Sequence, residues 1–203
     1  LGGTGNVGLG SGAFGTGLTT GTDNVAIGEN AGDALSGGTD NTLIGDNAGG
    51  ALTTGGNNVA VGSSALLTED GNGESVAVGF EALKLQNAGA AAYNVAVGYQ
   101  AGVAITTGTA NTLIGAVAGD AIDSGANNAG VGINALGSVT SGNHNVAMGT
   151  AALDAVTTTS YNVGIGGGAG GAIAGGEYNT IVGYAAGDAI TTGAGNVSLG
   201  MKA

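Results

Sequence analysis

The segment Asn24-Val25-Ala26-Ile27-Gly28 contains the motif that decides the fold. It recurs twelve times along the chain at spacings of 17 or 18 residues, with one spacing of 19. We number its Asn as position 0 of the repeat; position +4 is then always Gly and position +7 always Ala. Position 0 falls at Asn6, Asn24, Asn41, Asn58, Ser75, Asn94, Asn111, Asn128, Asn145, Asn162, Asn179 and Asn196. A period of this length predicts one supersecondary unit stacked on itself along the whole chain.

Positions +1 to +3 predict a strand, as in Val25-Ala26-Ile27, whose side chains alternate between two faces. Position +3 is apolar in every copy, and we expect its row to be buried inside the coil. Position +2 points the other way and is mostly small, as in Ala26 and Gly130. Because a strand that is apolar on both faces is typically buried on both, we expect the small row to contact other copies of the chain, most simply three about an axis.

A second, weaker strand is predicted at Ala104-Ile105-Thr106-Thr107-Gly108 and again at Ala189-Ile190-Thr191-Thr192-Gly193. Gly108 and Gly193 are expected to supply the positive φ of a tight corner. The fold class is therefore all-β: a repeat β-solenoid or β-roll of about 12 turns with about 17 residues per turn, assembled as a parallel homotrimer. With turns about 4.8 Å apart, the coil should be roughly 55–60 Å long. Residues 1–203 form a single array without caps, which we expect to be a segment of a longer fibre.

The recurring Asn and Gly residues are interpreted as structural corners, because Asn tolerates the left-handed conformation and stacks amide on amide. The clearest corner pairs are Asn24 and Gly28, Asn41 and Gly45, Asn94 and Gly98, Asn111 and Gly115, Asn145 and Gly149, and Asn179 and Gly183.

A second period of four turns overlies the first. At position +8 two glycines alternate with two large apolar residues, as in Gly32, Gly49, Leu66 and Leu83. Past duplication of a four-turn block explains this pattern. A binding surface presented once per block is the alternative.

Composition excludes several classes of protein. Gly accounts for 47 residues, but its regular phasing argues against disorder. The formal charge is −12 with only two cations, which argues against nucleic acid and anionic membrane surfaces as partners. No apolar run is long enough to cross a bilayer, so we expect no membrane insertion. There is no Cys, hence no disulfide framework or thiolate site.

Four residues are candidates for contact with a surface or glycan: Tyr93, His144, Tyr161 and Tyr178, all at position −1. The last three occur in successive units and are expected either to form an exposed aromatic stripe or to fill a variable corner. His144 is the only histidine, so one chain cannot build a histidine metal cluster or a Ser-His-Asp triad. We expect no catalytic residue, no metal site and no cofactor.

Two binding alternatives are weaker. Asp23 and Asp40 precede their corners, as in calcium-binding repeats, but the same position elsewhere carries other residue types. Thr pairs such as Thr106-Thr107 suggest an ice-binding face, yet adjacent strand residues point to opposite faces.

The unit Asn-Val-Ala-Ile-Gly-x-x-Ala resembles the head repeats of trimeric autotransporter adhesins and, more closely, the Gly-rich repeat of marine bacteriophage tail fibres. The segments Asn179–Gly187 and Ala189–Gly193 are similar to those fibre units. The resemblance covers essentially the whole chain and implies a trimeric β-roll or β-solenoid shaft outside the cell. It implies no catalytic residues. Adhesin head units are typically shorter than 17 residues, so the handedness and strand count of the coil are not implied.

Three functions are compatible with the sequence. The first is a shaft segment of an extracellular or virion appendage that spaces a host- or surface-binding tip from its base. The second is an adhesin rod that binds glycan or a surface directly through its corner residues. The third is a self-assembling extracellular filament of single-chain solenoids. The expected partner is the chain itself, with receptor or glycan contact through regions outside this segment.

Overall fold

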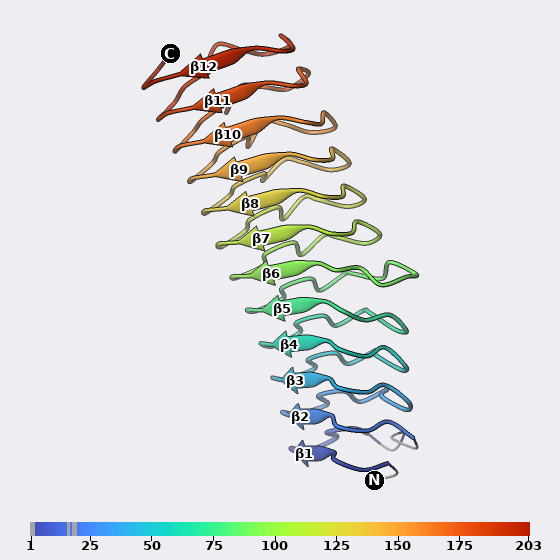
Figure 1. Ribbon diagram of the computed structural model, residues 1–203. Coiled ribbons are helices and arrows are strands. Elements are labelled where there is room, and N and C mark those ends of the chain that lie inside the picture. The colour runs from blue at the N-terminus through green and yellow to red at the C-terminus, as the bar shows by residue number, and fades with distance from the viewer. Residues whose placement is uncertain (1–2, 16, 18–19) are drawn as a thin grey trace.

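A computed structural model describes residues 3–15, 17 and 20–203. The described residues form twelve short strands in one continuous stack, with the N-terminus at one end and the C-terminus at the other (Figure 1). The strands are β1 (Val7–Leu9), β2 (Val25–Ile27), β3 (Thr42–Ile44), β4 (Val59–Val61), β5 (Val76–Val78), β6 (Val95–Val97), β7 (Thr112–Ile114), β8 (Ala129–Val131), β9 (Val146–Met148), β10 (Val163–Ile165), β11 (Thr180–Val182) and β12 (Val197–Leu199).

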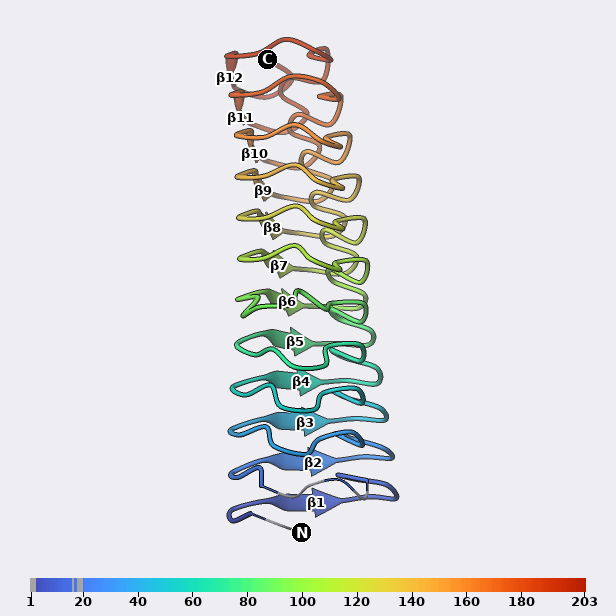
Figure 2. The same ribbon diagram turned by 90° about the vertical axis from the view of Figure 1, so that its right-hand side faces the viewer.

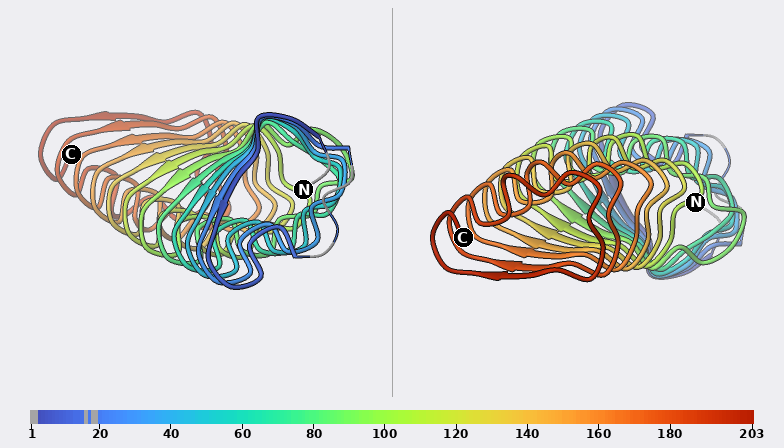
Figure 3. Two further views of the ribbon diagram at one scale, coloured as in Figure 1. Left: turned by 90° about the horizontal axis from the view of Figure 1, so that it is seen from below. Right: turned by 90° about the horizontal axis from the view of Figure 1, so that it is seen from above.

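All twelve strands belong to one parallel sheet whose order is the order of the chain. Corresponding positions of the repeat lie opposite each other throughout; for example, Leu113 pairs with Gly130. The chain is therefore an all-β solenoid, and each repeat completes one turn (Figure 2). Seen along its axis, the coil is elongated in cross-section, and successive turns are rotated relative to one another (Figure 3), as expected from the intrinsic twist of strands.

The predicted second strand does not form. Residues 104–108 and 189–193 run through bends and turns, so each turn has one strand. Gly108 and Gly193 are not among the residues with positive φ, so that expectation was also wrong. Gly is instead required there by close packing. A Cβ on Gly108 would lie 2.4 Å from the carbonyl oxygen of Gly125 in the next turn.

The prediction of which strand face is buried was wrong. In β2 to β6 the residue at position +2 is fully buried, whereas those at +1 and +3 are only half-buried. At position +3, Ile114, Met148 and Ile165 are exposed. Position +2, mostly small but occupied by Leu43, Leu113 and Ile181 in three turns, therefore lines the interior of its own coil, and the aliphatic residues at position +3 face outward. The interior is completed by positions 0, +7, +8 and +11, as in Asn24, Ala31, Gly32 and Leu35.

The four-turn period reflects an exchange of volume inside the coil. Leu43 at position +2 lies over the glycines at +8 in two turns: a Cβ on Gly32 or Gly49 would each approach it to 2.8 Å. Where +2 is Gly164, a Cβ would meet Leu153 at 2.7 Å. A large residue in one row thus requires a small one in the other. The pattern is internal packing rather than a binding surface.

Position +8 adopts left-handed backbone whatever residue it carries, from Gly49 (φ 57°) to Leu83 (φ 49°). This conformation costs a non-Gly residue about 1–2 kcal/mol. Burying a Leu side chain contributes about 1.5–3 kcal/mol. Burial therefore offsets the strain, and both residue types fit the position.

The position-0 amides form a ladder through the interior. The Asn111 Oδ1 accepts hydrogen bonds from the backbone N–H of Asn128 (3.0 Å) and its Nδ2 (3.1 Å), while the Asn111 Nδ2 donates to the Gly125 carbonyl (2.8 Å). The same backbone bond to the preceding Asn recurs in most turns. Corner glycines allow equally close stacking, because a Cβ on Gly115 would lie 2.4 Å from the Gly132 oxygen. The interpretation of these Asn and Gly residues as structural is consistent with this geometry.

The ladder is interrupted at Ser75, where two buried polar residues replace the missing amide. Gln86 Nε2 donates to Ser75 Oγ (3.1 Å) and to Glu69 Oε2 (3.0 Å), and Asn94 Nδ2 donates to Gln86 Oε1 (2.8 Å). Glu69 and Gln86 occupy position +11, which is aliphatic in the neighbouring turns. The substitution at one position is therefore compensated at another.

Candidate functional site

The outer side of the sheet has a centre that is similar in every turn and borders that differ between turns. We define the outer face as positions +1 and +3 of every strand, bordered by positions −1 and +5 at the two strand ends. Positions +1 and +3 carry only Val, Ile, Leu, Met, Thr and Ala. The described residues at position −1 are all exposed. The aliphatic centre of this face runs the length of the coil.

Three of the four sequence-predicted site residues lie together on the −1 border. The rings of His144 and Tyr161 stack with centroids 5.0 Å apart and planes 5° from parallel. Tyr161 and Tyr178 stack at 5.0 Å and 4°. The stripe forms because successive turns lie at nearly the spacing of stacked rings. All three residues have positive φ, which sets the rings at the corner in the same orientation.

Tyr93, the fourth candidate, lies apart from this stack, because Ala110 and Asn127 occupy the border between them. Its exposed hydroxyl donates to the Glu74 carboxylate of the preceding turn. That hydrogen bond, reinforced by the negative charge, raises the pKa of Tyr93.

Sequence reasoning pointed to position +5 as well as −1 for recognition, but named no candidate residue on this opposite border. Phe80 and Tyr99 at position +5 stack with centroids 5.4 Å apart, and Ile133 and Tyr184 are exposed in the same row. The signal was present in the sequence, since large apolar or aromatic residues recur at position +5 in the later turns. The sequence alone did not place these residues on one border, because it did not show which side of the strand faces outward.

The stacked arrangement limits what the −1 stripe can bind. Sugars contact aromatic residues chiefly through the open faces of the rings. Here Tyr161 has both faces covered by His144 and Tyr178. Only ring edges, the Tyr hydroxyl groups and the two terminal ring faces are free to contact a ligand.

Charge divides the outer face into two parts. Along β2–β5 the borders carry five carboxylates: Asp23, Glu29, Asp40, Asp46 and Glu74. Along β6–β11 the same two rows carry no Asp or Glu. That second part holds every Tyr of the chain, His144 and several exposed aliphatic residues.

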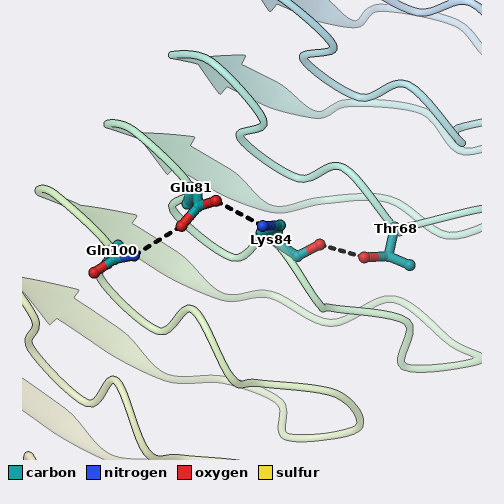
Figure 4. A network of polar contacts seen from close by, with 4 residues as sticks. All are labelled: Thr68, Glu81, Lys84 and Gln100. Atoms are coloured by element: carbon teal, nitrogen blue, oxygen red, sulfur yellow. Dashed lines mark hydrogen bonds and ion pairs between the residues drawn. The ribbon is translucent and has the colours of Figure 1, made fainter.

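A small polar network lies beside the boundary between these parts (Figure 4). Lys84 Nζ contacts Glu81 Oε1 at 2.6 Å, and Gln100 Nε2 donates to Glu81 Oε2 at 2.7 Å. The Thr68 hydroxyl donates to the Lys84 carbonyl, so the network joins three turns. Hydrogen bonds from Lys84 and Gln100 lower the pKa of Glu81. The Glu81–Lys84 contact is the one ion pair among the described residues.

The described part of the chain contains no site for the other candidate functions, metal binding and ice binding. No group of three His, Cys, Asp or Glu side chains is placed to hold a metal ion, and no pocket is present there. Where the structure describes both residues of a Thr pair, as in Thr106-Thr107, the segment is a bend rather than a strand and presents no flat Thr sheet to ice. Among the described residues, no helix is long and apolar enough to cross a membrane. Comparisons of the chain with protein-family models, with curated proteins and with solved structures found no match.

Proposed function

We propose that this chain is a structural rod: a shaft segment of an extracellular or virion appendage that spaces a surface-binding tip from its base. The observation that carries the proposal is the unbroken parallel sheet of twelve strands, in which corresponding positions pair from end to end. Each turn lengthens the coil by about 4.8 Å and is tied to the next by backbone and amide ladders. Such an array provides length and stiffness.

The proposed assembly is a parallel homotrimer whose copies run side by side. A rod made of several coils resists bending better than a single coil, and a bare parallel sheet favours a covering partner. The small +2 residues no longer support this association, since they are buried inside their own coil. The contact must involve the outside of the coil.

A second candidate function is direct adhesion through Tyr93, His144, Tyr161 and Tyr178. The exposed aromatic stripe favours it, although its rings cover one another's faces. A third is a filament of single-chain solenoids, which needs no lateral contact.

Removing one four-turn block tests the shaft proposal against adhesion. Deleting residues 111–178 removes four whole repeats and joins Ala110 to Asn179, which preserves the pattern of the repeat. We expect a folded rod shorter by about 19 Å in electron micrographs, with attachment of the intact appendage unchanged. Loss of attachment in a deletion variant that still forms the wild-type oligomer would contradict the shaft proposal. Substituting Tyr93, His144, Tyr161 and Tyr178 by Ala in the full-length chain then shows whether those residues carry the attachment.

A further inference from the structure

We propose that the β6–β11 part of the outer face is the surface through which copies of this chain associate, each covering the same strip of another copy. We define this outer strip as the strand residues at +1 and +3 together with the borders at −1 and +5, between Tyr93 and Tyr184. The inference rests on the lengthwise association proposed above and names its surface. In the trimer, each copy turns its outer strip toward the shared axis.

The first argument is the state of the sheet. Parallel sheets are nearly always covered on both faces, and here the coil covers only one. Residues such as Ile114 (41% exposed) and Met148 (47%) are large, apolar and directed away from the core. In every turn from β6 to β11 the residues at +1 and +3 are exposed or half-buried, so the strip is continuous.

The second argument is composition. Protein interfaces are enriched in aromatic residues and Met and depleted in Lys, Glu and Asp. The outer strip holds Tyr99, Met148, Tyr161 and Tyr184 and no Asp, Glu, Lys or Arg at its four positions. The β2–β5 part has the same aliphatic centre but a carboxylate on at least one border in β2, β3 and β5. Bringing two such borders together in a chain of charge −12 is unfavourable. Contact between copies through the β6–β11 strip, which has no carboxylates, is therefore more favourable than contact through the β2–β5 part.

The third argument is spacing and area. Side-chain rows on the strip repeat at every turn, about 4.8 Å apart, and a second copy offers rows with the same spacing along its full length. Six turns by seven residues make a strip of about 29 by 20 Å, or roughly 600 Å². The three strips that face the shared axis of the trimer bury up to about 1,800 Å² in total, compared with the roughly 1,200 Å² at which specific pairwise interfaces begin.

The test compares matched charge insertions at position +3. One variant carries Ile114→Glu, Met148→Glu and Ile165→Glu in the outer strip. Its control carries Ile27→Glu, Ile44→Glu and Val61→Glu in the β2–β5 part. Sedimentation velocity measures association, and circular dichroism checks that each variant is folded. We expect the wild type and the control to associate alike, and the strip variant to dissociate at least about a hundredfold more readily.

Cross-linking supplies a readout that does not depend on charged substitutions. The chain has no Cys, so Met148→Cys introduces a single thiol at the strip and Ile44→Cys one outside it. In a parallel assembly the thiols of two Met148→Cys copies meet and form a disulfide-linked dimer under mild oxidation. The Ile44→Cys variant should form such a dimer much more slowly, and equal rates for the two variants would contradict the proposed surface.

The outcomes separate the two proposals. A wild-type monomer at all concentrations overturns both lengthwise association and this surface. Association that persists unchanged in a folded strip variant overturns the surface alone. Equal loss of association in the control overturns the restriction to β6–β11, because the whole outer face would then be in contact.

Discussion

Neighbouring residues of β7 show the difference between the two sides of the sheet. Leu113 points into the coil and is fully buried, whereas Ile114 points outward and is 41% exposed. The inner side follows one rule in most turns: a large residue in one row lies against a small one in another, and amides pair with amides except at Ser75. The outer side keeps an aliphatic centre but changes its borders from acidic to aromatic along the rod. The inner side thus maintains the shape, and the outer side distinguishes one region of the rod from another.

The largest predicted effect comes from breaking the inner ladder. Asn111→Ala removes the acceptor of the Asn128 N–H and the donor to the Gly125 carbonyl, and leaves both without a partner in the interior. We expect a loss of about 3–5 kcal/mol in the free energy of unfolding, because an unpaired buried polar group costs about 1–3 kcal/mol. Urea unfolding followed by circular dichroism measures it. Thr112→Ala, one residue further on the outer side, is the control and should change stability by less than about 1 kcal/mol. Equal effects of the two would contradict the distinction between the sides.

Two truncations of similar size in β7, one on each side of the sheet, compare how much side-chain packing contributes to stability. Leu113→Ala leaves a cavity beside Gly119 and Gly130 in a filled interior, and should cost about 3–4 kcal/mol. Ile114→Ala removes a similar side chain from an exposed position and should cost less than about 1 kcal/mol in the isolated chain. Chemical denaturation at low protein concentration measures the two. If the loss of stability caused by Ile114→Ala grows as the protein concentration rises, the additional loss measures the contact of the outer strip with another copy.

Repairing the ladder should stabilise the rod by a smaller amount. The triple variant Glu69→Leu, Ser75→Asn and Gln86→Ile restores the consensus at the interrupted turn. We expect a gain of about 1–2 kcal/mol, because apolar packing replaces a buried carboxylate and the amide ladder becomes continuous. Ser75→Asn alone should destabilise the fold, since Gln86 occupies the space of the new amide. Thermal unfolding of the single and triple variants shows whether the three positions act together; additive effects would argue against the compensation.

Much of the fold was accessible from the sequence, since the 17-residue period predicted one array of parallel turns with Asn and Gly at the corners. The side of the strand that faces inward was not. Val25-Ala26-Ile27 is apolar on both sides, so alternation alone cannot assign the core. Volume decides it: the opposite wall lies so close that a Cβ on Gly8 would approach Phe14 to 2.9 Å. Position +2, which is small in most turns, therefore faces the inside.

The informative signals were correlations within the chain. Bulky Leu43 coincides with Gly32 and Gly49, and Ser75 coincides with the two polar residues at position +11, Glu69 and Gln86. Each correlation reports two side chains that share one space. The candidate site was predicted in part: the stripe of His144, Tyr161 and Tyr178 exists, but the stacking that covers the ring faces depends on left-handed backbone at position −1. Residues such as Tyr161 give no local sign of that conformation.

The smallest predicted effect concerns two carboxylates at position +9 of the repeat, Asp120 and Asp154, next to the buried position +8. Burial raises the pKa of Asp154 and of Asp120, both only partly covered. The folded chain then binds protons more tightly than the unfolded chain at pH values just above 3.8, the ordinary pKa of Asp. Stability contributed by these groups therefore rises as the pH falls through that window and is lost toward neutral pH. Asp154→Asn should raise the melting temperature at pH 7 slightly and flatten its increase as the pH falls toward 3.8, the ordinary pKa of Asp. Asp188→Asn, at the same repeat position but exposed, serves as the control. A steeper pH dependence in Asp154→Asn than in the wild type would show that burial does not dominate at this carboxylate, and that the hydrogen bond from its own backbone N–H, which lowers the pKa, outweighs it.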